Sequence, residues 1–250
     1  MKTSRHFIIF LVLVCFSLSM KAQDGLTDVQ RSMNLKPYDF GILIGMASYE
    51  GDVIKFSEEE TNLFTSAGIA FGLNFNYHLS KNLNGGISYR FAQISGDDKF
   101  ADAGTGRRER GFSFTNNLNE LSLRLEYAPL AHKNYKLTPY VYGAVGLAFG
   151  SPDVNFNESK QPDAMKSRIA KDKAEIEKSS LVFPIGFGLK YDIDENYSIK
   201  AEAALRVGAN DYLDGITNAA STKYNDYYGI GGIVISYKFG TKKGLTIKEF

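Results

Sequence analysis

The chain has 250 residues, with 29 Lys and Arg against 28 Asp and Glu, and a single cysteine at position 15. This balance excludes a strongly basic nucleic-acid-binding surface, so we expect no nucleic-acid partner, and one cysteine excludes a disulfide framework. The length suits one large β domain.

The N-terminus has the three parts of a secretory signal peptide. Lys2 and Arg5 precede the apolar run 7–20, and small Ala22 follows it. The run is too short for a transmembrane helix and no charged stop follows it. We expect cleavage after Ala22, which removes residues 1–22 together with Cys15. After this segment no apolar run reaches the roughly 20 residues of a spanning helix, so membrane crossing would require a barrel.

Eight segments alternate apolar with small or polar side chains, a period of two that predicts β-strands. They are residues 39–46, 69–79, 83–92, 120–127, 138–150, 181–192, 197–207 and 232–239. In the fifth segment Val141, Leu147 and Phe149 fall on one side, and Gly146 and Ala148 fall on the other. Each segment is about 10 residues long with one apolar face, which is typical of transmembrane β-strands.

The main alternative is a soluble eight-stranded barrel with its apolar face inside, as in a lipocalin. Against it, the second face is mostly Gly, Ala, Ser and Asn, which fits the narrow interior of an eight-stranded barrel. We therefore predict an all-β fold: an eight-stranded antiparallel up-and-down transmembrane barrel of the outer-membrane type, over residues 37–240. Its apolar face would contact outer-membrane lipids.

Short and long connections alternate along these strands. The short ones lie near residues 80–82, 128–136 and 194–196, and the long ones near 51–62, 97–110, 151–180 and 209–226. Outer-membrane barrels have short periplasmic turns and longer extracellular loops. With an even strand number, both termini are then expected in the periplasm, as an N-terminal segment 23–36 and a tail 241–250.

The longest connection, 151–180, contains a candidate helix. Met165, Ile169 and Ile176 have helical spacing, and Asp163 is available as an N-cap. A short amphipathic helix and a mobile charged loop remain the two alternatives.

Charged side chains also occur on the predicted inner face, and they are expected to pair because an isolated charge in a low dielectric is costly. The ten positions are Arg90, Glu120, Arg124, Glu126, Lys190, Asp192, Lys200, Glu202, Arg206 and Lys238. An ion-paired plug and a pore are both conceivable. Because eight strands leave an interior just wide enough for side chains, we favour the plug.

Few residues suggest catalysis or metal binding. His78 could belong to a Ser-His pair of a lipid hydrolase, but no partner nucleophile is identifiable and we predict no enzyme activity and no cofactor. The acidic stretches 58–60 and 97–98 could bind calcium weakly, although acidic loop residues are usually only solvated, so no metal site is predicted. The basic segment 106–110 could meet lipid phosphates or could serve only for solubility.

Five short motifs, in this order, resemble the PorG-like family of Bacteroidota outer-membrane proteins over nearly the whole mature chain. They comprise Tyr49, Gly51 and Asp52; Gly96, Asp97 and Asp98; Arg107 and Arg108; Thr138, Pro139 and Tyr140; and Asp211, Tyr212, Leu213 and Asp214. The resemblance implies an outer-membrane component of the type IX secretion system that tethers a periplasmic ring, formed by a lipoprotein and its partner, to the membrane.

Three functions are therefore considered. The first is an envelope anchor or scaffold whose segments 24–36, 128–136 and 240–250 contact periplasmic proteins. The second is a surface adhesin or receptor that works through its loops, although these lack the aromatic patches expected of a binding site. The third is an outer-membrane lipid-modifying enzyme, for which no Ser, His and Asp cluster is visible.

Overall fold

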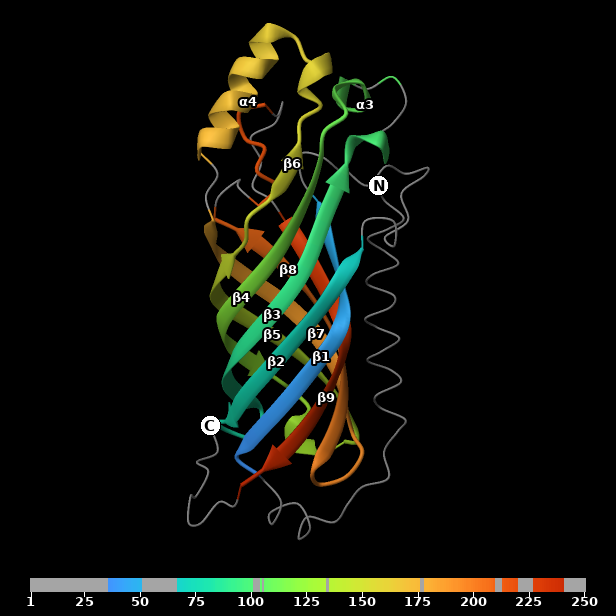
Figure 1. Cartoon of the computed structure of the whole chain (residues 1–250). Helices are drawn as coiled ribbons and strands as arrows, with labels where there is room; N and C mark the ends of the chain where they lie inside the picture. The colour runs from blue at the N-terminus through green and yellow to red at the C-terminus, as the bar shows by residue number, and fades with distance from the viewer. Residues whose placement is uncertain are drawn as a thin grey trace.

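The barrel consists of eight long strands that follow one another around a closed ring (Figure 1). The computed structural model describes residues 36–50, 67–100, 104, 106–133, 135–175, 178–209, 213–219 and 227–240. The long strands are β1 (Tyr38–Glu50), β2 (Gly68–His78), β3 (Leu83–Asp97), β4 (Ser113–Tyr127), β5 (Leu137–Phe149), β7 (Ser179–Asp192), β8 (Tyr197–Gly208) and β9 (Tyr227–Phe239). The predicted signal peptide, the loop 51–62 and the tail 241–250 lie outside the described residues.

Every strand pairs antiparallel with its neighbours, and β1 closes the ring by pairing with β9. That ladder runs from Tyr38 opposite Phe239 to Glu50 opposite Tyr227. The predicted eight-stranded antiparallel barrel is thus confirmed. We call the end with Tyr38 and Phe239 the turn end, because the short connections lie there, and the opposite end the loop end (Figure 1).

The apolar faces of the strands point outward and the small residues point into the barrel. Val141 and Leu147 are 53% and 47% exposed, whereas Ala148 is 1% exposed. A Cβ on Gly146 would lie 2.5 Å from the Cβ of Ser122, and one on Gly188 would lie 2.3 Å from the Tyr140 ring. The lumen therefore needs small residues at these positions, and the continuous apolar face on the outside distinguishes the fold from a soluble barrel.

Strands β3 and β4 are longer than predicted and rise beyond the rest of the barrel at the loop end (Figure 1). The sequence predicted 83–92 and 120–127, but their ladder continues to Asp97 opposite Ser113. A short strand, β6 (Asp153–Asn155), extends this sheet by pairing with β4 and was not predicted.

The loop end also carries helical segments, η1 (Asp98–Phe100), α3 (Gly106–Arg110), η3 (Glu158–Lys160) and α4 (Asp163–Glu175), while η2 (Ala131–Lys133) lies at the turn end. Of the two alternatives for segment 151–180, the structure therefore shows the helix. Asp163 is its first helical residue rather than its N-cap, because the carbonyl of Pro162 accepts from the N–H groups of Met165 and Lys166. Ile176 lies outside the described residues. Within the described ranges, no helix combines the length and apolarity needed to cross a membrane.

The loops at the loop end pack into a cap that is continuous with the apolar core of the upper barrel. The strands contribute Tyr49, Ile94, Phe114, Leu118, Val182 and Ile230 to this core. The segments that connect the strands contribute Phe112, Phe156, Ile169, Leu213 and Ile216. Two buried hydrogen bonds fasten it, from Tyr49 Oη to Asp214 Oδ2 (2.7 Å) and from Asn116 Nδ2 to the carbonyl of Leu213 (2.7 Å). These contacts fix the described loop segments to the loop end of the barrel.

Candidate functional site

Glu202 on β8 is the centre of a polar network that fills the middle of the lumen. Its carboxylate accepts from Arg124 Nη1 (3.0 Å) and Nη2 (2.8 Å) and from Arg90 Nη2 (3.2 Å). The hydroxyls of Tyr140 and Tyr142 on β5 also donate to it, at 2.9 Å and 3.0 Å. This saturated carboxylate suits a structural role better than proton transfer, because its lone pairs are already engaged.

A second layer lies closer to the loop end around Glu120 of β4. Its carboxylate accepts from Arg206 Nε (3.1 Å), from the Tyr228 hydroxyl (2.8 Å) and from Ser122 (3.2 Å). Arg206 and Glu120 are each 2% exposed, so this pair is removed from solvent.

A third layer lies toward the turn end, and it contains an acid that sequence reasoning missed. Asp39 of β1 faces Lys200 (Nζ to Oδ1 3.4 Å), and Glu126 accepts from Arg124 (3.0 Å) and Asn84 (2.9 Å). Asp39 is the first residue of the predicted segment 39–46 and was not among the ten predicted charges, although the same period of two places it on the inner face, where it is 1% exposed. The described lumen thus holds six basic and five acidic side chains, not six and four.

The mouth of the turn end holds the remaining predicted charges. Asp192 lies between two lysines, with Oδ1 2.5 Å from Lys238 Nζ and Oδ2 3.6 Å from Lys190 Nζ. All ten predicted charges therefore lie on the inner face, in layers along the lumen. Tyr140, Tyr142 and Tyr228 are additional partners of these charges, and they were not assigned to the network from the sequence.

Lysines are in excess around the turn end. We count the described residues 36–38, 79–83, 128–133, 135–137, 190–197 and 237–240 as the turn end. The basic residues there are Lys36, Lys81, Lys133, Lys136, Lys190 and Lys238, and the acidic residues are Asp192, Asp194 and Glu195. Six cations against three anions give this face a positive potential that favours acidic partners.

His78, the histidine considered for catalysis, lies at the end of β2 with Nδ1 2.6 Å from Oδ1 of Asn84. An amide is not a nucleophile, so this contact forms no hydrolase pair. In the described part of the chain, no group of three or more His, Cys, Asp or Glu side chains could hold a metal ion.

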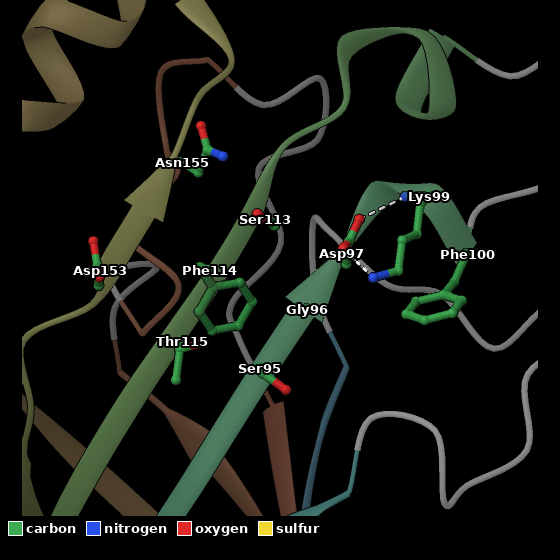
Figure 2. A pocket seen from close by; sticks show the side chains of 10 residues that line it. All are labelled: Ser95, Gly96, Asp97, Lys99, Phe100, Ser113, Phe114, Thr115, Asp153 and Asn155. Atoms are coloured by element: carbon green, nitrogen blue, oxygen red, sulfur yellow. Dashed lines mark hydrogen bonds and ion pairs between the residues drawn. The ribbon is translucent and has the colours of Figure 1, made fainter.

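A hollow of about 440 Å³ lies at the loop end, where β3, β4 and β6 stand beyond the barrel (Figure 2). We call it the outer hollow. Its lining residues are Ser95, Gly96, Asp97, Lys99, Phe100, Ser113, Phe114, Thr115, Asp153 and Asn155. It was missed from the sequence because its β3 and β4 residues lie beyond the predicted ends of these strands and because β6 was not predicted.

The motifs that carried the family resemblance take mainly structural positions. Tyr49 and Leu213 are buried in the cap core, Asp98 pairs with Arg110 (2.7 Å), and Tyr140 contacts Glu202. On the strands, Gly96 lies opposite Phe114, and Pro139 lies opposite Leu189. Asp97 lines the outer hollow, and Arg107 and Arg108 belong to α3. Thr138 donates from Oγ1 to the carbonyl of Tyr135 (3.1 Å), and Asp214 accepts from the Tyr49 hydroxyl. Gly51, Asp52, Asp211 and Tyr212 lie outside the described residues.

Comparison with known families gives one match, which spans residues 7–247 and is described as "Domain of unknown function (DUF6089)". The chain belongs to the DUF6089 family. No curated protein matches it. Because the family description states no function, the resemblance to PorG-like proteins and to type IX secretion remains a prediction for this DUF6089 chain.

Several solved structures are similar to the DUF6089 chain at low identity. Neisserial surface protein A has 12% identity over 81% of this chain and 97% of its own, with a TM-score of 0.47. A major outer membrane protein from Thermus thermophilus has 15% identity over 81% and 99%, with a TM-score of 0.45. The attachment invasion locus protein Ail of Yersinia pestis has 13% identity over 82% and 100%, with a TM-score of 0.40.

Proposed function

We propose that this chain is a non-enzymatic outer-membrane β-barrel that acts as an envelope anchor, with its turn end in the periplasm and its loop end at the cell surface. The main support for this proposal is the excess of basic residues at the turn end, where six lysines face three acidic residues. The lumen next to this end is filled by side chains of the barrel. Because the lumen is occupied by its own side chains, only the two ends remain as working surfaces.

An apolar belt around the barrel supports the membrane location. Outward side chains such as Ile44, Leu123 and Ile185 are 60%, 63% and 65% exposed. A soluble monomer rarely exposes apolar patches beyond a few hundred Å², whereas lipid would cover this belt. Exposed aromatic residues near the turn end, Tyr38, Tyr127, Tyr191, Tyr197 and Tyr237, fit the interfacial girdle of such barrels.

The lumen supports a scaffold rather than a conduit or an enzyme. Arg90, Glu120 and Arg206 are each at most 2% exposed, and Glu202 is bonded on both oxygens. A carboxylate held by two arginines and two tyrosines is a poor acid or base, because every one of these contacts favours the same charged state.

The partner is proposed from charge and from the family resemblance: a periplasmic lipoprotein or ring protein of a secretion complex that presents acidic side chains. Lys133 and Lys136 in the connection 128–136 are both exposed and lie beside the barrel mouth. With the predicted N-terminal segment 24–36 and tail 240–250, they would form the contact surface.

Charge reversal tests the anchor. The double variant Lys133→Glu, Lys136→Glu, and separately deletion of residues 241–250, should leave a folded, heat-modifiable barrel but reduce co-purification of periplasmic proteins from native membranes. The matched control is Arg168→Glu, Lys171→Glu on the exposed face of α4. If the turn-end variants recover the same partners in the same yield as the control, the anchor proposal is wrong.

A surface adhesin or receptor is the second candidate, and the packed cap and the outer hollow at the loop end favour it. Under this alternative, deleting α4 would abolish binding to cells or surface molecules, and the full-length protein would recover no periplasmic partner. An outer-membrane lipid-modifying enzyme is not supported by the contacts of His78.

A further inference from the structure

The outer hollow rests on an ordered array of polar side chains on the outward face of three strands. Because of the strand register, Asp97, Ser113 and Asn155 form one cross-strand row, and Ser95, Thr115 and Asp153 form the next. Neighbouring strands lie about 4.8 Å apart and alternate residues about 7 Å apart along a strand. The result is a polar grid on the scale of a sugar ring.

Much of the hydrogen-bonding capacity of this grid is unused within the described part of the chain. The side chains of Ser95, Ser113, Thr115 and Asp153 make no hydrogen bond or ion pair there. The side-chain oxygen of Asn155 accepts from the N–H of Asn157 (3.0 Å), which leaves its amide donors available. Hydroxyls, a carboxylate and an amide together can bind a ligand that both donates and accepts, as sugar hydroxyls do.

The charge of the hollow argues against an anionic ligand. Its two carboxylates, Asp97 and Asp153, outnumber its one cation, Lys99. Lys99 is moreover engaged by Asp97, with Nζ 2.8 Å from Oδ2 (Figure 2). A phosphate would therefore meet an unpaired carboxylate and no free cation, which is unfavourable.

An aromatic ring stands at the margin of the hollow. Phe100 is 40% exposed (Figure 2). Among the described residues of the loop-end connections, it is the only large apolar residue whose side chain is exposed. The sequence had suggested that these loops lack aromatic patches; one aromatic side chain is in fact presented beside the grid. An exposed ring can cover the C–H face of a pyranose while polar groups bind its hydroxyls.

We infer that the outer hollow is a saccharide-binding site for uncharged hexose units, with the grid binding hydroxyls and Phe100 covering one ring face. The saccharide could be the headgroup of an outer-leaflet glycolipid or a free glycan, since both present the same hydroxyls. This inference concerns the loop end and does not depend on the anchor function of the turn end.

The test uses the full-length protein in phospholipid nanodiscs, with maltotriose and chitotriose as probes and glucose 6-phosphate as the charged comparison. Saturation-transfer NMR should detect binding of at least one trisaccharide and weaker binding of the phosphate. Asp153→Ala and Phe100→Ala should each weaken that binding about tenfold or more. Asp163→Ala on α4, whose carboxylate lies outside the hollow, is the control and should not change it.

A second measurement identifies the source of the sugar. If Asp153→Ala also lowers the glycolipid that co-purifies from native membranes, the site serves the membrane's own glycolipid; if only trisaccharide binding falls, it serves a free glycan. Both outcomes support a saccharide site. The inference is overturned if the folded, heat-modifiable protein binds neither trisaccharide, if the hollow variants bind as well as the control, or if glucose 6-phosphate is preferred.

Discussion

Glu202 accepts five hydrogen bonds, more than any other described carboxylate of the lumen. Glu202→Gln keeps the shape but removes the charge that compensates Arg90 and Arg124. Breaking a buried pair by changing one partner costs about 3–5 kcal/mol, because the other charge stays buried. We expect a loss of this size in the free energy of unfolding, measured by urea titration in lipid vesicles.

Asp192→Asn is the comparison for Glu202→Gln. Asp192 lies at the mouth of the turn end, where its side chain and those of its two lysines are partly exposed, so water screens the loss and the cost should be well below that of Glu202→Gln. Equal losses at the two positions would show that the Glu202 contacts are not the main stabilising layer of the lumen.

Asp194 gives the turn between β7 and β8 a dependence on pH. The N–H groups of Tyr197 and Asn196 both donate to its Oδ1 at 2.7 Å and lower the pKa of this carboxyl. Because the pKa of Asp194 is lower in the folded state, the ionised carboxylate stabilises the turn at pH values above the unfolded pKa of about 3.9. This stabilisation is lost as the pH falls through the folded pKa. In an NMR titration, the amide signals of Tyr197 and Asn196 should shift with a midpoint below about 3.9, and Asp194→Asn should remove that titration. A midpoint at or above the unfolded value would contradict the prediction.

At the scale of the element, β4 shows how the two faces of a strand differ. Leu123 is 63% exposed on the outer face, whereas its neighbour Ser122 is 3% exposed and bonded to Ser88 at 2.8 Å. Arginine on the lipid face near the midplane costs about 2–4 kcal/mol, so Leu123→Arg should reduce assembly into the outer membrane, measured as the heat-modifiable fraction on gels. Ser122→Ala removes one hydroxyl and should have a mild effect. Similar losses from both changes would argue against lipid at the outer face.

The period of two was sufficient to predict the eight strands and their inward and outward faces, because lipid and a narrow lumen impose opposite demands on alternate residues. The prediction ended too early on β3 and began too late on β4, where the outward residues change from Phe91 and Leu121 to Gln93 and Asn117 toward the loop end. Both strands continue beyond the apolar belt, but their outward side chains are polar there. The alternation of apolar and polar residues therefore no longer indicates a strand.

Contacts between distant elements were beyond sequence reasoning. The lumen charges could be assigned to the inner face one strand at a time, but which acid meets which base depends on the stagger of strands across the barrel. For the same reason Tyr142 could not be matched with Glu202. The cap core joins Tyr49, Phe112, Phe156, Ile169 and Leu213, whose separations in the chain give no periodic signal.

At the scale of the whole molecule, the filled lumen predicts that the barrel does not conduct ions. Side chains of Arg90, Arg124, Arg206, Tyr140 and Tyr142 meet across it around Glu202 and Glu120. Purified protein in planar lipid bilayers should therefore give no steady conductance. Stable channels whose ion selectivity changes on Arg124→Gln or Glu126→Gln would show that the network lines a pore.

The orientation of the barrel determines which end can meet which partner, and single cysteines can measure it. The only cysteine of the chain is at position 15, inside the predicted signal peptide, so an introduced thiol is free of background. Lys171→Cys on α4 and Lys133→Cys at the turn end both replace exposed lysines. A membrane-impermeant maleimide should label Lys171→Cys on intact cells, and should label Lys133→Cys only after the outer membrane is permeabilised. Labelling of Lys133→Cys on intact cells would place the basic end outside, where it could not hold a periplasmic complex, and the anchor function would be excluded.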